Sequence, residues 1–151
     1  MVLNVRHVNY YLNHIYTVSK LFGYIEKYDL EGNFVNHLDL HSITPLFHPG
    51  KGYLGGPIPN TKICNGKLFI MSGIPADKIK NYVDIPDNIS FVICLIKVDV
   101  SKEDMVLEKV YYYFPQEREE VMIKGVFSFV MLDENTFVQS TAKSLELYNL
   151  K

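Results

Sequence analysis

The sequence contains no tryptophan and only two cysteines among its 151 residues, and it lacks any apolar run as long as a membrane-spanning helix. Such a helix needs about 20 consecutive apolar residues, so we expect no insertion into a membrane. The cysteines, Cys64 and Cys94, each lie inside an apolar run. This setting predicts buried free thiols rather than a disulfide or a reactive nucleophile.

A secretory signal is also missing, because the N-terminus has no succession of a basic end, an apolar block and small residues at a cleavage site. We therefore expect a cytoplasmic protein if the sequence is complete, and a periplasmic or extracellular one if a signal segment was removed. Excess charge is absent as well, since 15 Lys and Arg residues against 17 Asp and Glu residues give a formal net charge of -2. Nucleic acid, whose phosphates require a basic surface, is therefore not an expected partner.

The composition that remains is that of a globular domain. Hydrophobic residues make up 48% of the chain and charged residues 21%, so the chain can bury a sizeable core. Its length suits one domain of ordinary size. We therefore expect a single domain over residues 1–151.

The clearest structural signal is the stretch from Gly23 to Leu40, which predicts two strands joined by a tight turn at residues 31–33. Apolar and polar residues alternate on both sides of the turn with the period of two that a β-strand imposes. Gly32 can adopt the positive φ that a tight hairpin turn requires. This hairpin organises the prediction for the rest of the chain.

Comparable units of short strands follow it. Residues 5–40, 61–114 and 126–150 each combine strand-like runs with tight turns, and the third unit stops after three strands. Residues 67–72 and 90–100 are apolar on both faces, which is typical of a sheet covered on both sides. We predict an all-β fold of about two and a half four-stranded antiparallel meanders.

The segment YIEKYDLEGNFVNHLDL resembles the outer hairpin of bacterial six-bladed β-propellers of the broad NHL-like and TolB-like group, and SLELYNLK repeats its spacing near the C-terminus. The resemblance implies propeller blades, although the chain, having no tryptophan, lacks the Trp-Asp dipeptide of other propellers. A propeller closes with about four blades or more. The chain would then be a fragment of a larger propeller or would close a ring with another chain. A β-sandwich or an open barrel is the alternative fold.

The longest connections fall at one end of the predicted meanders. Segments 41–60, 73–89 and 115–125 would lie opposite the short turns, and long loops on a rigid β-scaffold commonly carry function. We therefore predict a non-catalytic binding or scaffold module that presents these loops to a peptide, a glycan or a protein. A hydrolase or lyase with its site on the same loop face is the alternative.

Five residues of these loops are candidate ligand contacts: His48, Lys51, Tyr53, Asp77 and Arg118. No catalytic residues can be assigned. His41 and His48 have no third ligand at a metal-like spacing, and the glycine-rich HPGKGYLGGP departs from the phosphate-binding loop motif. We expect neither a metal nor a cofactor.

Self-association is the last expectation. Open strand edges and apolar end faces, with Val92, Ile96, Leu145 and Leu147 on them, are a liability in an isolated monomer. We expect a two-fold dimer in which residues 2–6 pair beside residues 144–150 of the partner. The alternative is a longer parent chain that supplies the rest of a ring.

Overall fold

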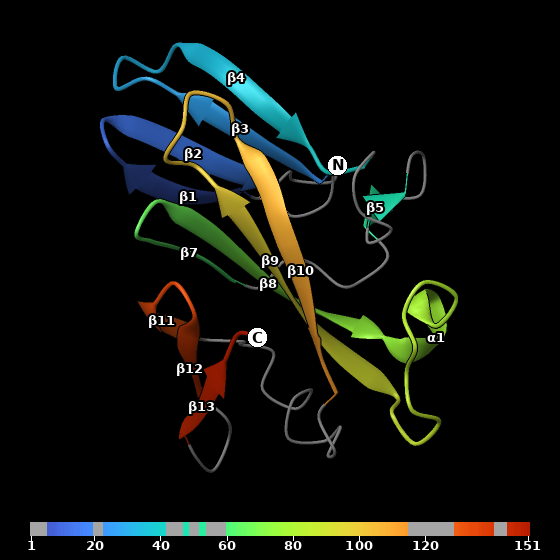
Figure 1. Cartoon of the computed structure of the whole chain (residues 1–151). Helices are drawn as coiled ribbons and strands as arrows, with labels where there is room; N and C mark the ends of the chain where they lie inside the picture. Colours follow the sequence, from blue (N-terminus) through green and yellow to red (C-terminus); the bar gives the residue numbers. More distant parts are fainter. Residues whose placement is uncertain are drawn as a thin grey trace.

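The computed structural model describes residues 6–19, 23–41, 47–48, 52–53, 60–114, 129–140 and 145–151. Three antiparallel meanders dominate it (Figure 1). The N-terminal sheet contains β1 (Arg6–Tyr11), β2 (His14–Ser19), β3 (Tyr24–Tyr28) and β4 (Phe34–Asp39). The central sheet contains β7 (Asn60–Cys64), β8 (Lys67–Pro75), β9 (Phe91–Asp99) and β10 (Val106–Tyr113). The C-terminal sheet contains β11 (Phe129–Asp133), β12 (Thr136–Ser140) and β13 (Leu145–Asn149).

In each of the three sheets the strands follow one another in chain order. A short ladder of β5 (Phe47–His48) and β6 (Gly52–Tyr53) stands apart from them. The predicted all-β fold of repeated antiparallel meanders is confirmed, and the described strands close no barrel.

The first hairpin of every meander turns through two residues, and the turn chemistry follows from the sequence. Asn65 and Gly66 have φ of 48° and 76°, as a tight two-residue hairpin requires. Leu12 and Asn13 form the corresponding turn of the N-terminal sheet with φ of 44° and 60°. In the predicted hairpin at residues 31–33, Gly32 has φ of 85°, and the carboxylate of Asp29 accepts hydrogen bonds from the main-chain and side-chain nitrogens of Asn33.

The central sheet lies between the other two sheets and is covered on both faces. One face contributes Leu68, Ile70 and Val98 to a core shared with the N-terminal sheet. The other face contributes Phe69 and Met71 to a core shared with the C-terminal sheet. Every residue of β9 is buried as a result. The apolar character of residues 90–100 on both sides of the strand is thereby explained.

This arrangement corrects one detail of the self-association prediction. Val92 and Ile96 are buried in the core between the N-terminal and central sheets, so they do not belong to an exposed end face. Leu145 and Leu147 are exposed, as expected.

Candidate functional site

Of the three long loops that the sequence analysis predicted at one end of the meanders, residues 73–89 are described, whereas residues 115–125 and most of residues 41–60 lie outside the described residues. The tight turns at residues 12–13, 31–33, 65–66 and 134–135 gather at the left of Figure 1, whereas α1 (Ala76–Ile79) and β5 lie at the right. The predicted loop at residues 73–89 is shorter than expected, because β8 continues to Pro75 and β9 begins at Phe91. The long β8–β9 hairpin therefore carries residues 76–90 outward, and we call this segment the tip.

The tip is ordered by its own hydrogen bonds and is anchored in the core between the N-terminal and central sheets. The amide of Ala76 donates to the carbonyl of Ser90 at 3.1 Å, which closes the base of the tip across the two strands. Ile79 and Ile89 are buried and extend the core between the N-terminal and central sheets. The amide of Ile89 also donates to the carbonyl of Pro86 at 2.9 Å. Because its buried residues fix the backbone, the tip holds its exposed side chains in defined places.

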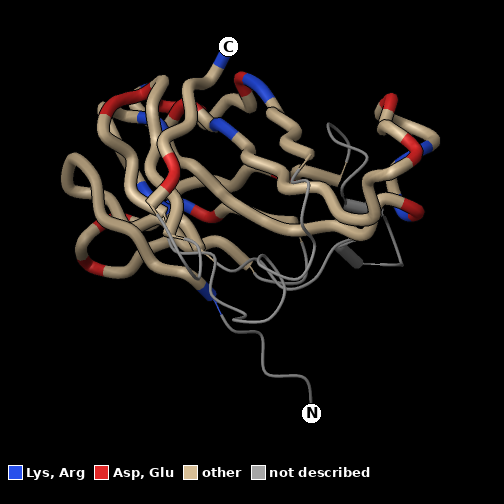
Figure 2. The backbone as a smooth tube through the Cα atoms, turned by 90° about the horizontal axis from the view of Figure 1, so that it is seen from below, with Lys and Arg blue, Asp and Glu red and all other residues tan. Residues whose placement is uncertain are grey.

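A hollow of about 400 Å³ opens in the tip. Its apolar lining comes from Ala76, Ile85 and Ile89, whereas the exposed Asp77 and Lys80 bring charge to its rim. The remaining lining residues are Pro75, Pro86, Asp87 and Ser90. Figure 2 shows acidic and basic residues close together on this projecting part of the backbone. An apolar floor with a mixed-charge rim suits a ligand that combines apolar and polar groups.

The five predicted contact residues have different outcomes. Asp77 lines the hollow and is the one for which a structural setting is described. His48 and Tyr53 belong to the β5–β6 ladder, which is described at the level of the backbone, with His48 paired to Gly52. Lys51 and Arg118 lie outside the described residues. Sequence reasoning missed Lys80 and Ile85, because it had no means of placing them around a common hollow.

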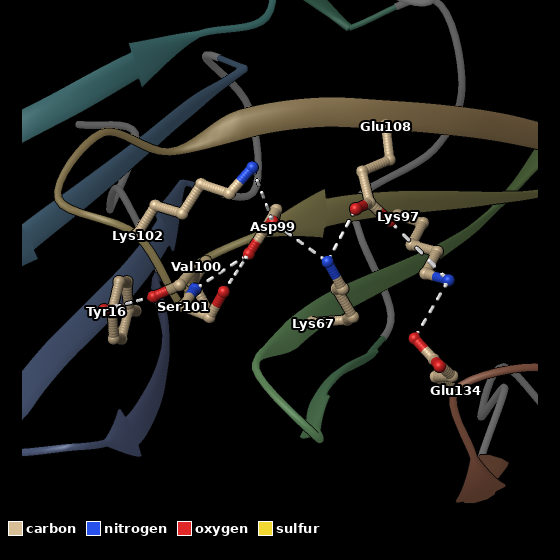
Figure 3. A network of polar contacts seen from close by, with 9 residues as sticks. All are labelled: Tyr16, Lys67, Lys97, Asp99, Val100, Ser101, Lys102, Glu108 and Glu134. Carbon is tan, nitrogen blue, oxygen red and sulfur yellow. Dashed lines mark hydrogen bonds and ion pairs between the residues drawn. The ribbon is translucent and has the colours of Figure 1, made fainter.

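A network of ion pairs and hydrogen bonds lies among the short turns, away from the tip, and links the central sheet to the C-terminal sheet (Figure 3). The carboxylate of Asp99 accepts hydrogen bonds from the amide and hydroxyl of Ser101 at 2.9 and 2.6 Å and pairs with Lys67 Nζ at 2.9 Å. Lys67 Nζ also lies 2.6 Å from a carboxylate oxygen of Glu108. Lys97 extends the network from the central sheet to Glu134 of the C-terminal sheet at 3.6 Å.

The contacts around Asp99 lower the pKa of its carboxyl group. Burial alone would raise the pKa, but the hydrogen bonds from Ser101 and Lys67 outweigh burial and hold the pKa well below its usual value. Hydrogen bonding to Glu108 and Asp99 in turn raises the pKa of Lys67, against the opposing effect of burial. Perturbed carboxylates often mark catalytic sites, but this one has its partners on the turn that ends its own strand and on the neighbouring strand.

Both cysteines are free thiols; Cys94 is buried, as predicted, whereas Cys64 is only partly buried. Burial raises the pKa of the Cys94 thiol far above its usual value. Burial, followed by the nearby charge of Asp133, raises the pKa of Cys64 as well. Among the described residues, no three His, Cys, Asp or Glu side chains gather closely enough to hold a metal ion.

A row of aromatic rings on the outer face of the N-terminal sheet was not predicted. His41, Tyr24, His37, Phe34 and Tyr28 follow one another with ring centroids 5.1, 6.1, 6.1 and 6.0 Å apart. We call these five residues the aromatic row. Strand alternation places successive residues on opposite faces of a sheet, but it cannot show which face is left open. By contrast, Tyr111 and Tyr113 pack toward the C-terminal sheet and Tyr112 toward the N-terminal sheet, so these three form no common platform.

Comparison of the chain with known protein families, curated proteins and solved structures found no match. Within the part of the chain that the structure describes, no helix is both long and apolar enough to cross a membrane. The case for function therefore depends on the geometry of the chain itself.

Proposed function

We propose that this protein is a non-catalytic binding module with a propeller-like arrangement of sheets, and that the hollow of the tip binds a peptide segment of a partner protein. The observation that carries the proposal is the hollow itself, which is held on a rigid hairpin at the end of the scaffold opposite the tight turns. Binding residues are commonly found on loops that a rigid β-scaffold positions.

The propeller-like arrangement is supported by where the sheets approach each other. β7, the first strand of the central sheet, lies beside β1 on one side and β11 on the other, and these are the first strands of their own sheets. Successive sheets therefore converge at their first strands. Such convergence is what blades do around the central axis of a propeller.

The chemistry of the hollow favours a peptide. Its volume of about 400 Å³ accommodates a few side chains, and Ile85 with Ile89 offers them an apolar surface. Asp77, Asp87 and Lys80 are exposed and present two acceptor groups and one donor group at the rim. None of the residues that line the hollow is aromatic, whereas sugar rings are usually recognised by stacking on aromatic side chains. A peptide with an apolar residue flanked by polar groups fits best.

Panning a phage-displayed peptide library against the wild-type protein tests this proposal. Enriched peptides are titrated into ¹⁵N-labelled protein, and the shift changes are expected to concentrate in residues 75–90. The double variant Asp77→Ala, Lys80→Ala should weaken binding by about tenfold or more. The variant Asp104→Ala, Lys102→Ala removes the same residue types from an exposed turn at the other end and should bind like the wild type.

Two results would overturn the proposal. One is the absence of any enriched peptide that shifts residues 75–90. The other is equal binding by the tip variant and the turn variant, which would move the peptide site elsewhere. A glycan array run beside the panning separates the ligand classes, since glycan binding that the tip variant abolishes would replace the peptide as the ligand.

A further inference from the structure

The stack of three sheets ends in two open faces on which apolar side chains are exposed; on the N-terminal sheet they surround the ion pair of Arg6 with Glu26. On the C-terminal sheet, Val130, Leu132, Leu145 and Leu147 point outward and are between 57% and 74% exposed. On the N-terminal sheet, Val8, Tyr10 and Phe34 are between 56% and 67% exposed, beside the rest of the aromatic row. Apolar surfaces of this kind usually mark sites of protein association.

The two faces are not equivalent, because every sheet in the stack points the same way. In each sheet the second strand begins directly after the first tight turn. The second residue of that strand is Ile15 in the N-terminal sheet, Leu68 in the central sheet and Phe137 in the C-terminal sheet. The third residue is Tyr16, Phe69 and Val138, respectively. Leu68 and Phe137 face the preceding sheet, whereas Tyr16 and Phe69 face the following one. By strand alternation, Ile15 and Val138 then face outward at the two ends.

The third strands of the three sheets are oriented in the same way as the second strands. Lys27 and Lys97 pair with Tyr16 and Phe69, respectively, and Leu147 pairs with Val138, so the three residues are equivalent. Lys27 Nζ donates to the carbonyl of Glu103 in the following sheet at 3.1 Å. Lys97 reaches the following sheet in the same way, at Glu134. Leu147 has the same position but an apolar side chain that is left exposed.

A second equivalence shows what the open N-terminal face resembles. Glu26 and Tyr28 of β3 are joined by a hydrogen bond, and their equivalents by register, Glu146 and Tyr148 of β13, are joined by the same bond. In the C-terminal sheet, Tyr148 packs against Tyr113 of the preceding sheet with ring centroids 5.5 Å apart. The open face of the N-terminal sheet thus carries the same hydrogen-bonded Glu–Tyr pair as a face that is covered elsewhere in the same chain.

We propose that the outer face of the C-terminal sheet packs on the outer face of the N-terminal sheet of a second copy, and that two copies close one ring. In the other two sheets, the face equivalent to the open C-terminal face is covered by the sheet that follows in the chain. The face equivalent to the open N-terminal face is covered by the sheet that precedes it. Each chain supplies one of each kind, so two chains related by a two-fold axis satisfy both. The ring contains six meanders, three from each copy, which lies within the usual range for propellers.

This assembly concerns the end faces and does not depend on ligand binding at the tip. It also differs from the predicted pairing of residues 2–6 with residues 144–150, which stays a prediction because residues 2–5 and 144 lie outside the described residues. The contact proposed is between faces, as it is between the sheets within the chain.

Sedimentation equilibrium and light scattering of three proteins test the proposal. The wild type should have twice the 17.5 kDa mass of one chain. Val8→Asp places a charge on the N-terminal face, and Leu147→Asp places one on the C-terminal face. Each should dissociate at concentrations at which the wild type is a dimer. Tyr82→Asp, at an exposed position of the tip and outside both end sheets, is the matched control and should remain a dimer.

Mixing the two variants gives the decisive result. A mixed dimer of Val8→Asp with Leu147→Asp has both charges in one seam and leaves the other seam intact, so mixing should restore dimers. Contact between two like faces would not be rescued in this way, and lack of rescue overturns the proposal. A monomeric wild type, or a mass that keeps growing with concentration, overturns it too. Circular dichroism checks that the variants fold, and Val130→Asp replaces Leu147→Asp if the latter does not.

Discussion

Replacing Asp99 with asparagine is expected to lower the free energy of unfolding by about 2 kcal/mol at neutral pH. The Asp99 side chain is 5% exposed and pairs with Lys67 Nζ at 2.9 Å. Asparagine keeps the shape and can still accept a hydrogen bond from the amide of Ser101. It removes the charge that strengthens these contacts, and charged hydrogen bonds contribute about 1.5–3 kcal/mol each.

The loss should not reach the 3–5 kcal/mol that is typical of a buried charge left without a partner. Lys67 keeps a second carboxylate, that of Glu108, at 2.6 Å. The lysine therefore stays paired in the variant. This second contact sets the upper limit of the expected effect.

The effect should depend on pH in one direction. The pKa of Asp99 lies well below its usual value in the folded chain, because its hydrogen bonds outweigh the opposing effect of burial. In the unfolded chain the pKa is about 3.9. Its contribution to stability is therefore fully present above that pH and declines as the pH falls toward the folded pKa. The difference between wild type and Asp99→Asn should be constant at neutral pH and should shrink below about pH 4.

Urea denaturation at a series of pH values measures the difference. Asp84→Asn, which removes the same charge from an exposed position of the tip, is the control and should behave like the wild type at neutral pH. A loss for Asp99→Asn no larger than that of the control would refute the structural role assigned to the network. A difference that grows as the pH falls would refute the assigned direction of the pKa shift.

Two further predictions concern the turn and the thiols. Gly66→Ala should lower stability by about 1–2 kcal/mol in urea denaturation, because φ is +76° and an added Cβ would lie 2.8 Å from Cβ of Ser101. Gly32→Ala should cost less, since its φ is also positive but nothing lies within 4 Å of the added Cβ. Cys94 should react with a thiol reagent only after unfolding, because it is fully buried with a raised pKa, whereas Cys64, which is only partly buried although its pKa is also raised, should react slowly in the folded protein. Equal rates in the single variants Cys64→Ser and Cys94→Ser would contradict this assignment.

Much of the fold could be predicted because each meander is encoded locally. The alternation of residues 24–28 and 34–39 and the turn between them are visible in consecutive residues. The extension of β8 was missed because Gly73 and Pro75 are typical strand breakers. In the described structure β7 pairs with β8 only as far as Met71, so Pro75 faces no strand on that side and its missing N–H donor carries no penalty.

The site was less predictable than the fold. Asp77 could be placed in a loop, but the hollow around it requires Ile85 to come near, and that depends on how residues 80–90 fold back. The aromatic row posed a related difficulty. Alternation assigned Tyr24 and Tyr28 to a face of the sheet, whereas the exposure of that face depends on the order in which whole sheets are stacked.

The complete burial of β9 also has a consequence for the protein before it folds. The segment FVICLIKVD has no solvent-facing position, and its first six residues carry none of the charges that usually keep hydrophobic strands from aggregating. Lys97 and Asp99 lie near one end, and the six residues before them resemble the short apolar segments that stack into fibrils. While the chain is being synthesised or refolded, this strand is therefore the segment most in need of rapid coverage by its neighbours.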